Sequence, residues 1–69
     1  MFTKSEMTSV EQYFQKLFKN PGITLKEGTG KEAPAEVAIN GQFIGVVYKD
    51  VDEGETSYDF NMSILAEDL

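Results

Sequence analysis

The dipeptide Asn40-Gly41, set between two runs of alternating apolar and polar residues, is the feature that most limits how this chain can fold. Both positions of a type I′ turn need positive φ, which Asn and Gly adopt most readily, so the pair predicts a two-residue β-hairpin. The flanking runs, residues 35–39 and 42–49, are its expected strands. The turn also decides which side chains share a face, because a shift of one residue would reverse the whole pattern.

Residues 8–19 carry a helical periodicity. Their apolar side chains recur at intervals of three and four residues, which places them along one face of a helix. Thr8 or Ser9 can cap the first turn. The helix ends at residues 20–22, Asn-Pro-Gly, because proline disfavours a helical conformation in the residue before it. Residues 1–7 are expected to be flexible. The apolar stripe consists of Val10, Tyr13, Phe14, Leu17 and Phe18.

Beyond the helix the apolar residues alternate with period 2, as they do in half-buried strands. Residues 23–26 and 56–65 are the expected first and last strands, and residues 66–69 form a tail. An antiparallel sheet with one apolar face needs a covering layer, and the helical stripe supplies it. The sequence therefore predicts a single α+β domain over residues 1–69, in which one N-terminal helix packs on a four-stranded antiparallel β-meander (α-β-β-β-β). Six aromatic residues are assigned to core faces: Tyr13, Phe14, Phe18, Tyr48, Tyr58 and Phe60.

The composition removes several classes of chemistry. The chain has no cysteine and no histidine, so thiolate nucleophiles, disulfides, imidazole bases and the commonest ligands of transition metals are missing. We therefore expect a non-enzymatic protein with no catalytic residue, no cofactor and no metal site. The net charge of -6 disfavours direct binding to nucleic acid. No segment has the roughly 18 to 20 apolar residues that span a bilayer, and the N-terminus lacks the apolar run of a signal peptide, so we expect a cytoplasmic protein without membrane contact.

Acidic residues gather in the predicted loop at residues 50–55, Asp-Val-Asp-Glu-Gly-Glu. Clustered carboxylates bind hard cations such as Ca²⁺ and Mg²⁺. The spacing does not fit an EF-hand loop counted from Asp50, because Glu55 falls where glycine is required and Asn61 where a bidentate glutamate should stand. A solvated hairpin end is the other interpretation. The candidate acidic surface consists of Asp50, Asp52, Glu53, Glu55 and Asp59.

A second candidate surface lies on the sheet face turned away from the helix. The hairpin register sends Phe43, Gly45 and Val47 to this face, with Ala38 beside Phe43. Gly45 lies inside a strand, where glycine marks a bulge or a close backbone approach. A bulge there would reverse the parity beyond it, turning Val47 inward and Tyr48 outward while Phe43 stays outside. The candidate interface consists of Ala38, Phe43, Gly45 and Val47.

Three stretches carry a family pattern: Phe-Ile-Gly-Val at residues 43–46, Asp-x-Asp-Glu-Gly-Glu at 50–55, and Ser-Tyr-x-Phe-x-Met-x-Ile-Leu at 57–65. In these stretches the chain resembles a small bacterial family known as domain of unknown function 3126. The resemblance extends from about Asn20 to the C-terminus. It implies a short, single-domain, cytoplasmic protein, and it brings no activity, cofactor or catalytic residue.

Two hypotheses about function follow. The first is a protein-binding or self-associating module, with a homodimer as one form, that uses the open face of the sheet. The second is a binder of cations or cationic surfaces through residues 50–55. This second class includes an acidic mimic that occupies a nucleic-acid-binding protein.

Overall fold

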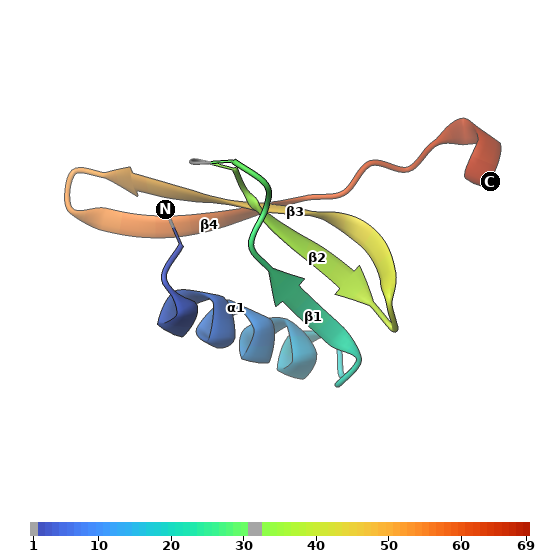
Figure 1. Cartoon of the computed structure of the whole chain (residues 1–69), viewed down its shortest axis with the longest axis horizontal. Coiled ribbons are helices and arrows are strands. Elements are labelled where there is room, and N and C mark those ends of the chain that lie inside the picture. The colour runs from blue at the N-terminus through green and yellow to red at the C-terminus, as the bar shows by residue number, and fades with distance from the viewer. Residues whose placement is uncertain (1, 31–32) are drawn as a thin grey trace.

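The computed structural model describes residues 2–30 and 33–69 and shows one helix beside a four-stranded antiparallel sheet (Figure 1). The strands lie in the sheet in the order in which they follow along the chain, and each pairs antiparallel with the next. The predicted α+β meander is confirmed. The elements are α1 (Lys4–Leu17), β1 (Ile23–Lys26), β2 (Ala35–Ile39), β3 (Gln42–Asp52), β4 (Glu55–Asn61) and a 3₁₀ turn, η1 (Ala66–Asp68).

Helix α1 begins at Lys4 rather than at the predicted Thr8. Thr3 caps it, because the Thr3 hydroxyl accepts from the Glu6 N–H at 3.1 Å and the Glu6 carboxylate accepts from the Thr3 N–H at 2.9 Å. This reciprocal capping box satisfies backbone N–H groups that the first turn leaves without partners. Residues 4–7, expected to be flexible, therefore form the first turn, and Met1 lies outside the described residues.

Two side chains of α1 bind the backbone of β1. Nε2 of Gln15 donates to the carbonyl oxygen of Ile23, and the N–H of Leu25 donates to Oε2 of Glu11, both at 2.9 Å. β1 is an edge strand, and these bonds occupy backbone groups that an edge would otherwise expose. The helix consequently lies along the β1 side of the sheet (Figure 1).

The core lies between α1 and the sheet face turned toward it, which we call the inner face. Phe14 is central to it, with its ring centroid 5.8 Å from that of Phe18 and 5.3 Å from that of Phe60. Because α1 covers the β1 side rather than the whole sheet, the core is small. The buried apolar residues are Val10, Phe14, Ile23, Leu25, Ala35, Val37 and Val47.

The assignment of six aromatic residues to the core is wrong for four of them. Phe14 is buried and Phe60 is half-buried, but the other side chains are substantially exposed. Tyr13 lies on α1 and Phe18 is the residue that caps its C-terminus, and both are turned largely to solvent. Tyr58 lies on the inner face of β4. Tyr48 is turned to the opposite face by a bulge in β3.

Two-residue turns join β2 to β3 and β3 to β4. Asn40-Gly41 has φ values of 51° and 86°, which confirms the predicted hairpin. Glu53-Gly54 repeats this conformation, with φ values of 50° and 82°. Residues 50–55 are therefore not a loop but the tip of a hairpin, and β3 extends to Asp52 rather than to residue 49.

A β-bulge interrupts β3 next to Gly45. Phe43 pairs with Ala38 of β2, whereas Gly45 pairs with Val37. Ile44 is thus an additional residue on β3, and it reverses the alternation of side chains beyond it. The reversal is the outcome that a bulge at this glycine was predicted to have.

Candidate functional site

The bulge changes which residues face away from the helix. Val47, assigned to the candidate interface, is fully buried on the inner face opposite Phe60. Gly45 is also buried. Both belong to the interior because the extra residue in β3 turns them inward. Tyr48 takes the outward position instead and is 51% exposed.

The outward side of the sheet, which we call the outer face, carries an apolar patch. Phe43 is 60% exposed and lies opposite the half-buried Ala38. Val46 and Tyr48 extend the apolar surface along β3. A hollow of about 460 Å³ lies between this part of β3 and residues 63–68. We define the outer patch as Ala38, Phe43, Val46 and Tyr48.

Four of the five predicted acidic residues share the outer face with this patch. On β3 and β4 they alternate with the inner-face residues, and Asp59 lies directly opposite Tyr48. Asp52 lies opposite Glu55, so two like charges face each other at the hairpin tip. No group of three or more carboxylates is positioned to hold a metal ion in the described part of the chain. The outer carboxylates are Asp50, Asp52, Glu55 and Asp59, while Glu53 lies in the turn itself.

Gly45 allows β4 to approach β3 closely. A Cβ atom at this position would clash with the backbone oxygen of Asn61 and would come within 2.9 Å of the Phe60 ring. The sequence predicted a bulge or a close approach here, and the structure has both. Gly45 therefore serves the packing of β4 against β3.

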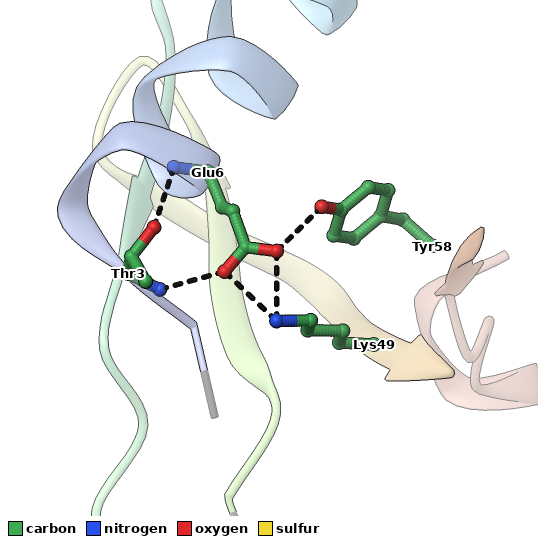
Figure 2. Close-up of polar contacts among 4 residues, drawn as sticks. All are labelled: Thr3, Glu6, Lys49 and Tyr58. Carbon is green, nitrogen blue, oxygen red and sulfur yellow. Dashed lines mark hydrogen bonds and ion pairs between the residues drawn. The ribbon is translucent and has the colours of Figure 1, made fainter. Parts of the chain in front are cut away.

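A polar cluster that the sequence did not predict lies at the start of α1 (Figure 2). Nζ of Lys49 is 2.9 Å from Oε1 and 2.8 Å from Oε2 of Glu6, and the Tyr58 hydroxyl donates to Oε2 at 2.7 Å. Lys49 and Tyr58 lie opposite each other on β3 and β4. We call Thr3, Glu6, Lys49 and Tyr58 the Glu6 cluster. The spacing of Thr3 and Glu6 fits a capping box and could have indicated the cap, but not the strand partners.

These contacts hold Glu6 in its ionised form. The hydrogen bond from Lys49, then those from the Thr3 N–H and the Tyr58 hydroxyl, lower the pKa of Glu6 from 4.5 to about 2. The Glu6 carboxylate in turn raises the pKa of Tyr58, because it stabilises the protonated phenol. A carboxylate bound by three donors is unsuited to proton transfer near neutral pH. The cluster thus fastens the helix to the hairpin.

An apolar groove runs between α1 and β4 on the inner face. It has a volume of about 350 Å³ and exists because α1 sits over β1 and leaves β4 incompletely covered. Tyr13 on one wall is 61% exposed, and Tyr58 on the other is 38% exposed. The lining residues are Ser9, Val10, Tyr13, Phe14, Tyr58 and Phe60.

The C-terminal residues 62–69 leave the sheet after Asn61 (Figure 1). The last strand was predicted over residues 56–65, but its ladder runs only from Glu55 to Asn61, with Val46 as the last partner. The segment that follows carries exposed large apolar side chains at Met62, Ile64, Leu65 and Leu69.

A comparison with protein families matches residues 6–68 to the family described as protein of unknown function, DUF3126. The chain belongs to the DUF3126 family. In this DUF3126 protein the matched residues include Glu6, Lys49 and Tyr58, and the C-terminal segment up to Asp68. Searches of curated proteins and of solved structures gave no match. Within the described residues, no helix has the length and apolar character to cross a membrane.

Proposed function

We propose that this DUF3126 protein is a non-enzymatic protein-binding module whose outer patch binds a segment of a partner protein that carries apolar and basic side chains. The observation that carries this proposal is the position of two exposed aromatic side chains, Phe43 and Tyr48, beside carboxylates on one face. Aromatic residues are enriched among the contacts that dominate protein interfaces.

The negative charge around the outer patch favours a partner with basic side chains. Asp59 lies opposite Tyr48, and Asp50 follows on the same face of β3. Lys26 is a basic residue of this face, and it is already paired with Glu36 at 3.7 Å. A partner with lysine or arginine beside its apolar anchor would gain attraction from these carboxylates. Since the net charge is -6, nucleic acid is not a partner that we propose.

A second candidate function rests on the hairpin tip. Asp52 and Glu55 lie opposite each other, and such like-charge pairs are destabilising unless a cation lies nearby. A strongly basic surface would relieve this repulsion without any contact to the aromatic side chains. This is the behaviour of an acidic mimic that occupies a nucleic-acid-binding protein.

Affinity capture from cells that make the protein, with matched variants as bait, tests both candidates. The proposal expects a partner that Tyr48→Ser or Phe43→Ser loses and that Leu69→Ser, altered at an exposed site away from the patch, retains. Loss with Asp52→Asn and Glu55→Gln, but not with Tyr48→Ser, would favour the second candidate instead. A partner retained by every one of these variants would contradict both.

A chain without cysteine needs no oxidising compartment to reach its folded state. We accordingly propose that the interaction takes place in the cytoplasm. Expression of the protein with a fluorescent tag, followed by fractionation, tests this location.

A further inference from the structure

The two edges of the sheet are treated differently by the rest of the chain. At β1, Gln15 and Glu11 of the helix bind backbone groups of the edge. At β4, in the part of the chain that the structure describes, no other element forms a hydrogen bond with the backbone groups along the free edge of the strand. Residues 55–65 also contain neither lysine nor proline, the residues that commonly protect an edge from pairing. β4 is therefore open to another strand.

The sequence of β4 extends farther than the strand itself. Tyr58 and Phe60 lie on the inner face, and the same alternation places Met62 and Ile64 in phase with them. Residues 62–65 nevertheless have no partner strand, and Met62 and Ile64 are 50% and 66% exposed. A segment with strand periodicity and no partner within its own chain can gain one from a second chain.

We propose that the occupant of this edge is a second copy of the chain, paired antiparallel so that the two β4 strands and their C-terminal extensions form one continuous ladder. The two-fold axis passes at Asn61, which then lies opposite Asn61 of the second copy. Phe60 lies opposite Met62 of the second copy, and Tyr58 opposite its Ile64. Residues 62–65 of each copy thereby receive the partners that their own β3 does not provide.

The side chains of the extension fit the surface that this pairing offers. Residues paired directly across two antiparallel strands lie on the same face, so Met62 and Ile64 of the second copy lie beside Phe60 and Tyr58. These two aromatic residues form one wall of the apolar groove under Tyr13. The aliphatic side chains can therefore enter the groove, and two-fold symmetry repeats this burial in the other copy.

The positions of the carboxylates are also compatible with this register. Asp59 lies opposite Ser63 of the second copy, so no two carboxylates face each other in the central part of the ladder. The next like-charge position, Glu55 opposite Glu67, falls outside the ladder, because residues 66–68 form the 3₁₀ turn η1. A second copy therefore fits in backbone pairing, in apolar contacts and in charge.

This inference does not rest on the proposed partner binding, because the β4 edge and the outer patch have no residue in common. A monomeric protein that still loses its captured partner on Tyr48→Ser would contradict the dimer and leave the proposed function standing. A dimer that captures the same partners with and without Tyr48→Ser would support the dimer and contradict the proposed function.

A cysteine scan tests the register, since the natural chain has no cysteine to interfere. We expect Asn61→Cys to form a disulfide-linked dimer on mild oxidation, because the two residues face each other across the axis. Thr24→Cys, exposed on β1 at the other edge, should form no disulfide-linked dimer under the same conditions. Equal cross-linking of both variants would overturn the proposed register.

Sedimentation across a concentration series, combined with amide hydrogen exchange, tests the contact itself. We expect a dimer in which the amides of residues 62–65 are protected. Ile64→Lys should raise the dissociation constant by roughly tenfold or more. The control Leu69→Lys, beyond the ladder, should leave it unchanged. A wild-type protein that stays monomeric throughout, or a dimer insensitive to Ile64→Lys, would overturn the inference. Protection of residues 62–65 only on addition of a different protein would overturn it too.

Discussion

Glu6 and Lys49, 43 residues apart in the chain, are joined by an ion pair with an N–O distance of 2.8 Å. Tyr58 binds the same carboxylate from the next strand. The first turn of α1 is thus tied to both strands of the β3–β4 hairpin at one point. This tie is polar, and its strength depends on the ionisation of one group.

Stability should therefore fall in acid partly through Glu6. Its folded-state pKa of about 2 lies below the ordinary value of 4.5, so the ionised form stabilises the fold. That contribution is complete above the ordinary value and is lost as the pH falls from about 4.5 toward 2. We expect Glu6→Gln to flatten the decline of the melting temperature in this window. Glu53→Gln, at the hairpin turn, is the matched control and should keep the wild-type slope. Equal slopes in all three proteins would show that the cluster does not contribute.

Phe14→Ala should destabilise the protein by about 3–5 kcal/mol, the usual cost of truncating a buried phenylalanine. Phe14 of α1 contacts Phe60 of β4, so its loss leaves a cavity between the helix and the sheet. Phe18→Ala removes the same atoms from a side chain that is 54% exposed and should cost clearly less. Urea titration of both variants measures the difference. Equal losses would mean that α1 does not pack on the sheet through Phe14.

The bulge predicts opposite outcomes for two neighbouring residues. Val47→Ser places a hydroxyl among buried apolar atoms and should cost about 2 kcal/mol or more. Tyr48→Ser changes an exposed side chain on the outer face and should cost within about 1 kcal/mol. Thermal unfolding of the pair decides between the registers, because a hairpin without the bulge would give the reverse order.

Gly45→Ala should be destabilising by about 1–3 kcal/mol, although alanine suits a strand no worse than glycine does. The added methyl group has no room beside the Asn61 backbone and the Phe60 ring. Ser57→Ala, at an exposed site on β4, should change stability by about 0.5 kcal/mol or less. Wild-type stability in Gly45→Ala would show that β4 does not approach β3 at this point.

The fold class could be predicted because each element has a local signal. The stripe containing Phe14 and the Asn40-Gly41 turn are both short-range patterns, and both proved correct. The start of α1 was missed because Thr3 and Glu6 carry no apolar periodicity, and the helical stripe alone points to a later residue. The second turn was hidden because Glu53 is not a residue that favours positive φ.

The candidate surfaces could be predicted only in part, because a single extra residue changes them. Phe43 lies before the bulge, and its exposure followed from the turn. Val47 lies after the bulge, and whether Ile44 is accommodated as an additional residue depends on how β4 packs against Gly45. The Glu6 cluster joins α1 to a hairpin that is distant in the chain, and no spacing within the sequence reports such a contact.

The order of the strands bears on how quickly the chain reaches this structure. Every strand pairs with its neighbour in sequence, and two of the three connections are two-residue turns, so little loop-closure entropy is lost as each ladder forms. Topologies of this kind fold faster than those with distant pairings. The bond between Glu6 and Lys49 closes a far larger loop. We expect the hairpins to assemble early and the N-terminal turn of the helix to dock late, after the rate-limiting step.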